Sequence, residues 1–225
     1  MIGSEYRVSD VMTRTVVALA AGATFKDIVR TVEVQRISAL PVLDTGNRVV
    51  GVVSEADLLR KEEFRDSVPD RGPRARPPAG LEKAQAVTAA DLMTSPAVTV
   101  RPDATLAQAA RAMARHGVKR LPVVDGDGVL KGIVSRSDLL RVFLRSDRDI
   151  AEEVRREVVL GRFPDPIESV GVEVHEGVVT LTGRVRDLSV VPLAVRLARS
   201  VEGVVDVRCA LTGPPHRPAL EPDLP

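Results

Sequence analysis

The stretch GVVSEADLLR at residues 51–60 decides the fold, because the chain carries it a second time. It returns as GIVSRSDLLR at residues 132–141, an offset of 81 residues. At this offset residues 8–60 align with residues 89–141 without a gap, and 18 of the 53 positions are identical. An ungapped match of that length indicates an internal repeat.

Both copies predict the same order of elements: a short strand, a helix, a β-hairpin and a second helix. In the second copy, Thr105 and Gln108 form a capping box at the start of the first helix, and Gly117 ends it. The hairpin joins LPVVD (121–125) to VLKGIVS (129–135). One such unit covers its sheet poorly, so we expect the copies to pack face to face about a pseudo-twofold axis.

The chain divides into five segments of α/β or α+β class. Residues 7–62 and 88–145 hold the repeats, and residues 63–87, rich in proline and charge, are expected to be a flexible linker. Residues 146–212 predict a small αββαβ unit, and residues 213–225 a disordered tail. The apolar faces expected for the two helices of this unit are Ile150, Val154 and Val158, then Leu193, Leu197 and Val201.

Composition excludes several kinds of function. Of the 225 residues 44% are hydrophobic, enough for substantial cores. The net charge of +1 gives no general attraction to nucleic acid, and 2% aromatic residues offer no platform for stacked bases. The single cysteine, Cys209, excludes an internal disulfide, and its alternation with apolar residues predicts burial. The three histidines have no metal-ligand spacing, so no metal site is expected.

The sequence also bears on the compartment. No apolar run reaches the ~20 residues that a membrane helix needs. VVALAAGA at residues 16–23 looks like a short export signal, but the second copy has AVTVRPDA at the equivalent residues 97–104, with two charged side chains. The segment therefore belongs to folded chain, and we expect a cytoplasmic protein.

The pattern Ser-x-x-Asp stands where the last strand of each repeat meets the next helix, as Ser54 with Asp57 and as Ser135 with Asp138. In one interpretation each pair only satisfies free amides at the helix start. In the other, the positive helix N-terminus and the serine hydroxyl bind a phosphate, and the aspartate accepts the hydroxyls of a ribose. The glycine three residues before each serine would leave room for a flat base.

Each repeat resembles a CBS motif, and the two together resemble a tandem CBS, or Bateman, module over residues 7–145. The resemblance rests on DVMT (10–13) and DLMT (91–94), on the Leu-Pro-Val strands, and on Gly-x-x-Ser-x-x-Asp-Leu-Leu in both copies. Such modules bind adenosyl compounds such as AMP, ADP, ATP or S-adenosylmethionine between the repeats, and they commonly dimerise. The resemblance therefore implies an adenosyl ligand and a homodimer.

The resemblance also implies roles for single residues. Ser54 and Ser135 would bind phosphate, and the two aspartates would bind ribose. The base pocket would be lined by apolar residues of both copies: Val17, Val98, Leu40, Pro41, Leu121 and Pro122. Three cations stand beside the second motif: Lys119, Arg120 and Arg136. The first copy has none there, so we expect the Ser135 site to bind phosphate more strongly, and the Ser54 site to be weaker or to prefer an uncharged nucleoside.

Residues 146–212 resemble a BON domain through GVVTLTGRV (177–185) and GVVDV (203–207). In that family the domain is usually associated with membrane or phospholipid contact. Here fourteen acidic residues face ten basic ones over residues 146–225, which disfavours attraction to anionic lipid. We therefore expect this unit to contact an unknown protein partner, to oligomerise or to receive another ligand.

These observations favour a regulatory protein without enzymatic activity, in which the CBS pair senses an adenosyl ligand and the BON domain mediates interaction. No nucleic-acid partner and no cofactor other than this regulatory ligand are expected. A structural or oligomerising protein without a small-molecule ligand is the main alternative, and lipid association through the BON domain is another. A nucleotide hydrolase is disfavoured, because the sequence has no paired acid and base, metal cluster or phosphate-binding glycine loop.

Overall fold

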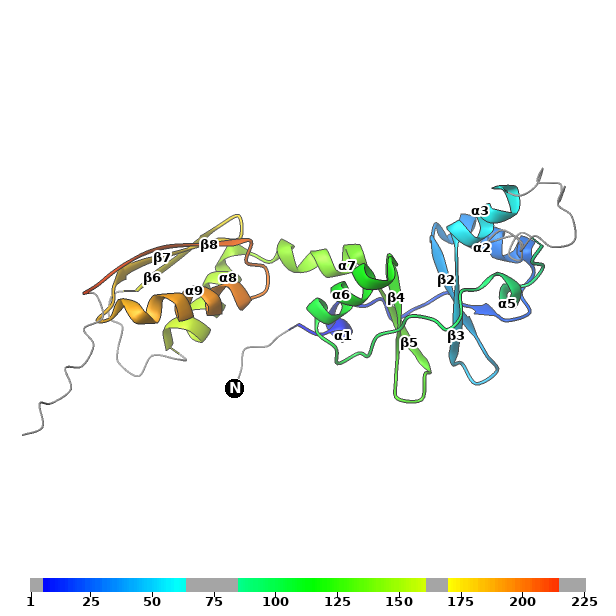
Figure 1. Cartoon of the computed structure of the whole chain (residues 1–225), viewed down its shortest axis with the longest axis horizontal. Coiled ribbons are helices and arrows are strands. Elements are labelled where there is room, and N and C mark those ends of the chain that lie inside the picture. The colour runs from blue at the N-terminus through cyan, green and yellow to red at the C-terminus, as the bar shows by residue number, and fades with distance from the viewer. Residues whose placement is uncertain (1–5, 64–84, 161–169, 215–225) are drawn as a thin grey trace, which may run out of the picture. The chain divides into compact units, whose positions relative to one another are not determined.

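The computed structural model describes residues 6–63, 85–160 and 170–214, whose elements are drawn in Figure 1. They form two compact units. One contains residues 7–139, and the other contains Tyr6 together with the chain from Leu140 onward. Most of the expected linker (63–87) and of the expected tail (213–225) lies outside the described residues.

Each repeat has the predicted mixture of helices and strands. The first repeat contains β1 (Leu19–Ala20), α2 (Phe25–Gln35), β2 (Ala39–Leu43), β3 (Val49–Ser54) and α3 (Glu55–Glu63). The second contains α6 (Leu106–His116), β4 (Arg120–Val124), β5 (Leu130–Ser135) and α7 (Arg136–Leu140). In both, the two long strands pair as antiparallel hairpins, which confirms the predicted hairpins.

The helix boundaries follow from the capping residues. The capping box of Thr105 and Gln108 is confirmed, with both hydrogen bonds present. Gly117 ends α6 in the left-handed conformation, at φ 66°, as predicted. Arg36 stands at the equivalent position of the first copy and takes the same conformation, at φ 50°. The two copies therefore share backbone geometry even where the residue differs.

The repeats exchange their short opening helices, α1 (Val8–Val11) and α5 (Ala89–Leu92). Helix α1 comes from the first copy but is bonded to the second, where Val8 N donates to Ala104 O at 2.9 Å. Helix α5 comes from the second copy, and Ala89 N donates to Ala23 O of the first at 2.9 Å. In Figure 1, α1 lies by α6 and β5, and α5 lies by α2 and β3.

The exchange fills the space over two glycines. A Cβ on Gly132 would lie 2.7 Å from the Met12 sulfur and 2.9 Å from the Thr13 carbonyl oxygen. A Cβ on Gly51 would lie 2.5 Å from the Met93 sulfur. The prediction that these glycines leave room for a flat base is wrong, because side chains of the exchanged segments occupy that space.

The second unit has the predicted αββαβ order. Its elements are η1 (Arg141–Leu144), α8 (Asp147–Val154), the π-helical turn η2 (Arg155–Leu160), β6 (Gly171–His175), β7 (Val178–Arg184), η3 (Leu188–Val190), α9 (Val191–Ser200) and β8 (Asp206–Thr212). Strand β7 is central, antiparallel to β6 and parallel to β8. Glu176 and Gly177 turn the hairpin with positive φ angles of 49° and 72°.

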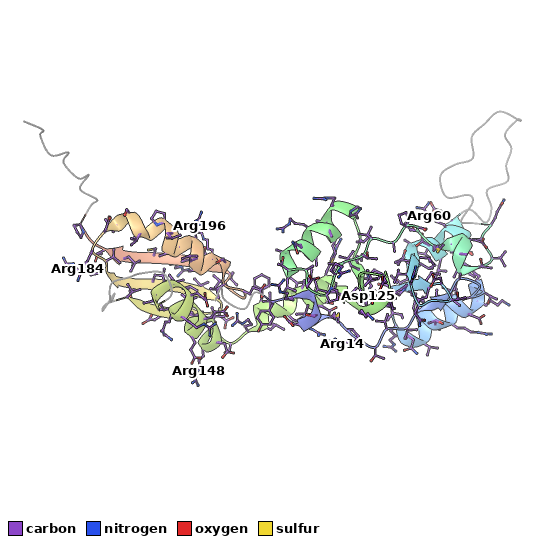
Figure 2. All side chains as sticks on the ribbon, turned by 90° about the horizontal axis from the view of Figure 1, so that it is seen from below. Arg14, Arg60, Asp125, Arg148, Arg184 and Arg196 are labelled. Carbon is purple, nitrogen blue, oxygen red and sulfur yellow. The ribbon has the colours of Figure 1, made fainter. Side chains whose placement is uncertain are left out.

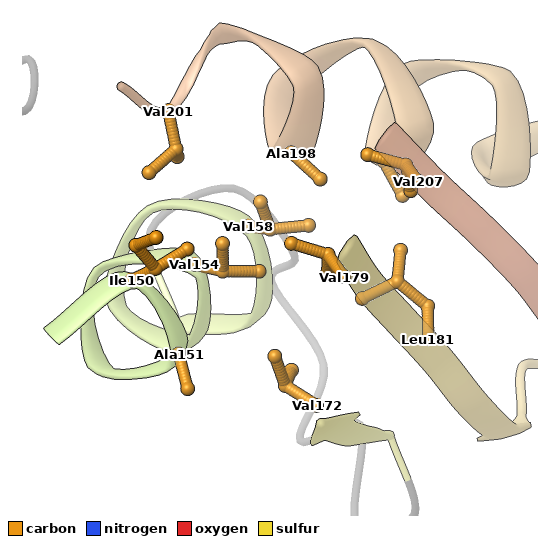
Figure 3. Close-up of a cluster of buried hydrophobic side chains, with 11 residues drawn as sticks. Ile150, Ala151, Val154, Val158, Val172, Val179, Leu181, Ala198, Val201 and Val207 are labelled. Carbon is orange, nitrogen blue, oxygen red and sulfur yellow. The ribbon is translucent and has the colours of Figure 1, made fainter. Parts of the chain in front are cut away.

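Helices α8 and α9 cover one face of this sheet, and their buried side chains form the core in Figure 3. The predicted face of Ile150, Val154 and Val158 is confirmed. In α9, however, Ala194 and Ala198 are buried whereas Leu193 is 39% exposed. On the outer side of these helices Arg148 and Arg196 point away from the core (Figure 2). Cys209 is exposed on the edge strand β8, so the prediction of its burial is wrong.

Candidate functional site

The two Ser-x-x-Asp corners have the same internal geometry. Ser54 donates its backbone N–H and its hydroxyl to Asp57 Oδ2, at 2.9 and 2.7 Å. Ser135 donates in the same way to Asp138 Oδ2, at 2.9 and 2.6 Å. Both carboxylates are buried, 8% and 7% exposed. Each aspartate therefore stabilises the start of its own helix, as the capping interpretation requires.

The surroundings of the corners differ. Beside Asp138, the Ser137 hydroxyl lies 2.8 Å from the Ser135 hydroxyl, whereas the first copy has Ala56 at this position. Arg136 Nη2 donates to Val118 O at 3.0 Å, which ties this guanidinium to the loop before β4. The predicted phosphate contact from Arg136 would have to compete with that hydrogen bond.

A cavity of about 260 Å³ opens at the first corner. Its lining residues come from both repeats: Ser38, Ser54, Glu55, Ala56 and Asp57 from the first, and Thr94, Pro96, Val98, Gly117, Lys119 and Arg120 from the second. The exchange explains this mixture, because Val52 and Thr94 form two backbone hydrogen bonds, of 3.1 and 2.9 Å, that hold the segment after α5 against β3. The Ser54–Asp57 corner therefore faces an opening built by both copies.

Two cations of the second repeat line that opening at the first repeat's corner. Lys119 and Arg120 line the cavity of the first corner, although Arg120 is also the cross-strand neighbour of Ser135. The expectation of stronger phosphate binding at Ser135 rested on these cations standing beside the second motif. The structure places them beside both corners, so the charge count of each copy does not by itself decide which corner binds phosphate more strongly.

Arg120 brings an unsatisfied donor to the cavity. Its Nε is buried and has no hydrogen-bond partner among the described residues. A buried donor without an acceptor costs about 1–3 kcal/mol, and more when the group is charged.

The remaining predicted ligand residues do not gather at this cavity. Val98 lines it, but Val17 does not and is 38% exposed. Leu40 and Leu121 have no exposed surface and belong to the hydrophobic cores. Pro41 and Pro122 are buried within β2 and β4, so the Leu-Pro pairs support the fold and do not line this cavity.

The sequence interpretation missed several lining residues, including Ser38, Thr94 and Gly117. Ser38 lies beside the corner through the β2–β3 hairpin, whereas Thr94 and Gly117 come from the second repeat, and Thr94 is held there by its backbone bonds to Val52. The repeated DVMT and DLMT motifs could have indicated the exchange of α1 and α5, because the sequence interpretation gave them no packing partner within their own copy.

Two carboxyl groups outside the cavity have lowered pKa values. The hydroxyl of Thr88 donates to Asp91 at 2.7 Å, and this bond, together with backbone N–H donors, holds the Asp91 pKa below its usual range. Lys131 at 2.9 Å from Asp125, with the backbone N–H of Val129, lowers the pKa of Asp125. Both groups cap local structure.

The described residues contain no group of three or more His, Cys, Asp or Glu side chains arranged to hold a metal ion. Within the same residues, no helix is both long enough and apolar enough to cross a lipid bilayer.

Two family models match this chain. The CBS domain model matches residues 8–63 and 89–145, and the BON domain model matches residues 146–214. The chain belongs to the CBS domain family. It carries two CBS repeats followed by a BON domain, as the sequence resemblance indicated.

The relatives align along the CBS pair. An uncharacterized protein of Methanocaldococcus jannaschii is 29% identical over 153 residues, covering 61% of this chain and 90% of the relative. The chloroplastic CBS domain-containing protein CBSX2 of Arabidopsis thaliana is 31% identical over 157 residues, 64% of this chain and 66% of the relative. The crystal structure of CBSX2 in complex with AMP has 31% identity and a TM-score of 0.51, covering 62% of this chain and 96% of that chain.

Matches to enzymes cover only part of each enzyme. Inosine-5'-monophosphate dehydrogenase of Nitrosopumilus maritimus is 28% identical over 133 residues, 59% of this chain but 23% of the enzyme. Homoserine O-acetyltransferase of Methanohalophilus mahii is 30% identical over 128 residues, 57% of this chain and 22% of the enzyme. These matches therefore carry no catalytic activity over to the present chain.

Proposed function

We propose that this protein is a non-enzymatic regulator whose CBS pair binds an adenosine nucleotide at the Ser54–Asp57 corner. The main support is the cavity, which is lined by Asp57 of one repeat and by Lys119 and Arg120 of the other. A ligand that fills it touches both repeats. Such a ligand can favour one arrangement of the pair to the extent that it binds that arrangement more tightly.

The chemistry of the lining matches the two ends of a nucleotide. Arg120 and Lys119 line the cavity and provide charged donors for phosphate oxygens. Asp57, at the base of the same cavity, is an acceptor suited to ribose hydroxyls. The AMP complex of CBSX2, at 31% identity, supports the same ligand class. We therefore assign the stronger anion site to the first corner, the reverse of the sequence expectation.

The test is a titration of the full chain with AMP and with adenosine, followed by calorimetry. Arg120→Gln removes the charge but keeps most of the side-chain length. Because a hydrogen bond to a charged group contributes about 1.5–3 kcal/mol, AMP affinity should fall by about 10-fold or more, and adenosine affinity should change little. Arg111→Gln, an exposed site on α6 outside the cavity lining, is the matched control. Equal AMP affinity in the Arg120→Gln variant would contradict the assignment.

A structural role without ligand is the second candidate. It is favoured by the fact that each aspartate already accepts two hydrogen bonds from its own serine. A thermal-shift series with AMP, ADP, ATP and S-adenosylmethionine separates the two. At about 100 times its dissociation constant a ligand stabilises the folded state by about 2.7 kcal/mol, which is readily measured. Flat melting curves for all four compounds would favour the structural candidate.

The proposal includes a homodimer formed through the CBS pair, a cytoplasmic location and a protein partner for the BON domain. Sedimentation of the full chain over a range of concentrations measures the dimer directly. Co-sedimentation with anionic vesicles tests the lipid alternative, which the acidic balance of residues 146–225 disfavours.

A further inference from the structure

The chain passes between the CBS unit and the BON unit at two places. One passage is the peptide bond between Tyr6 and Arg7, and the other is that between Leu139 and Leu140. The second leaves from α7, the helix whose start Asp138 stabilises. The first leads directly into α1, which the exchange fastens to the second repeat. Both passages therefore connect to the second repeat.

On the CBS side, the first passage is firmly held. Arg7 Nη1 donates to Asp103 O at 2.5 Å. Farther along, Thr13 and Ile133 form two backbone hydrogen bonds of 2.9 Å each. Ile133 lies on β5 two residues before Ser135. Backbone hydrogen bonds thus join the strand that leads to Ser135 to the segment that begins at Arg7.

On the BON side, Tyr6 is held by Glu202 and Arg145, and Glu153 in turn binds Arg145; we call these four residues the Tyr6 clasp. The Tyr6 N–H donates to Glu202 Oε2 at 3.1 Å, and the Arg145 guanidinium lies 5.4 Å from the centre of the Tyr6 ring. Arg145 also donates to Glu202 O at 2.7 Å and to Glu153 Oε2 at 2.6 Å. The side chains of this ion pair are only 14% and 13% exposed, so the clasp is built into the BON unit.

We propose that the Tyr6 clasp couples the Ser135–Asp138 corner to the BON domain. A change at this corner alters the BON unit, whereas the same change at the Ser54–Asp57 corner does not, because neither passage starts from the first repeat's corner. The clasp extends the proposed function by giving the nucleotide-binding unit a route to its output. Only the ligand-driven form of this coupling rests on the proposed function.

Hydrogen exchange of the full chain tests the coupling without ligand. Asp138→Asn weakens the acceptor for Ser135, and we expect the amides of residues 201–214 to exchange about fivefold faster, or more, at the lower end of typical coupling between sites. Asp57→Asn is the matched control and should change those amides by less than about twofold. Equal effects of the two substitutions on the BON unit would overturn the proposal.

A second comparison isolates the clasp. In a Tyr6→Ala background the effect of Asp138→Asn on residues 201–214 should fall below about twofold. Glu202→Ala removes the acceptor of the Tyr6 N–H but keeps the Arg145 bond to the backbone carbonyl of residue 202. It should reduce the effect of Asp138→Asn in the same way as Tyr6→Ala. Arg148→Ala breaks an exposed ion pair of 3.1 Å on α8 and should leave the Asp138→Asn effect intact. An Asp138→Asn effect that survives both clasp variants would contradict the proposed route.

Addition of AMP then tests the ligand-driven form. AMP in the cavity lies against Arg120, which is the cross-strand neighbour of Ser135, so we expect its binding to reach the second corner. Saturating AMP should therefore slow exchange in residues 201–214 of the wild-type chain, and Tyr6→Ala should remove that change. Failure of AMP to bind would contradict the proposed function and leave the Asp138→Asn comparison standing. Binding of AMP without any change in the BON unit would overturn the ligand-driven coupling.

Discussion

The Ser54–Asp57 and Ser135–Asp138 corners have nearly the same internal hydrogen bonds but different surroundings. In both, one carboxylate oxygen accepts two hydrogen bonds from the preceding serine. The first corner faces a cavity with two cations from the other repeat, and the second begins α7, from which one chain passage leads to the BON unit. A repeated motif therefore specifies a repeated helix start, while its neighbours decide what each copy can do.

The largest expected difference between the repeats concerns their glycines. In Gly132→Ala the new methyl would meet the backbone oxygen of Thr13, which cannot move without disturbing α1. In Gly51→Ala the three nearest atoms all belong to the Met93 side chain, whose sulfur can move aside more easily than a backbone oxygen. Overpacking typically costs about 1–3 kcal/mol, so we expect about 3 kcal/mol for the first and about 1 kcal/mol for the second. Urea unfolding of both variants measures this, and equal losses would mean that the exchanged segments are equally yielding.

The aspartates should give smaller and equal losses when no ligand is present. Asp57→Ala and Asp138→Ala each leave a half-buried serine hydroxyl and its backbone N–H without their acceptor, which should cost about 1–2 kcal/mol. AMP should break this equality, because only Asp57 lines the described cavity. Melting curves with and without AMP should show the stabilisation lost in Asp57→Ala and retained in Asp138→Ala. The opposite order would return the main ligand site to the second corner.

The smallest expected effect is a difference in acid sensitivity between the two hairpins. The second has Lys131 beside Asp125, where the first has Val50. Lys131 lowers the pKa of Asp125 in the folded state, so the ionised Asp125 stabilises the folded protein. This contribution is complete above the unfolded pKa of about 4, and it is lost as the pH falls through the lower pKa of the folded state. Urea midpoints of the wild type and of Lys131→Gln, from about pH 6 to about pH 3, should show a slightly shallower decline in the variant. An unchanged profile would mean that Lys131 does not act on Asp125.

Local patterns made much of the fold predictable. A Thr with a Gln three residues later, or a Ser with an Asp three residues later, satisfies backbone groups within one turn, so caps and helix starts could be assigned from the sequence. The hairpins followed from strand patterns separated by short turns. Both kinds of contact join residues that are close along the chain.

The cavity could not be predicted in the same way, because it depends on contacts between distant residues. The backbone bonds of Val52 with Thr94 bring part of the second copy to the first motif, and Lys119 and Arg120 arrive with the neighbouring strand. A charge count for each copy placed these cations beside the second motif, where Arg120 does pair with Ser135, but it could not show that they also line the cavity of the first corner. In α9 the larger residue Leu193 was expected inside, but the close approach of the helix to the sheet selects Ala194 and Ala198.

The reciprocal trade of α1 and α5 has a consequence for how such a protein can be divided. A single CBS repeat cut from this chain would lack the methionine that covers its glycine and the partner for its opening amides. Two identical fragments could supply both to one another, so an isolated repeat should assemble in pairs or not fold. The smallest self-sufficient piece of this module is thus the doublet, and an ancestral single-copy form would have had to be a swapped dimer.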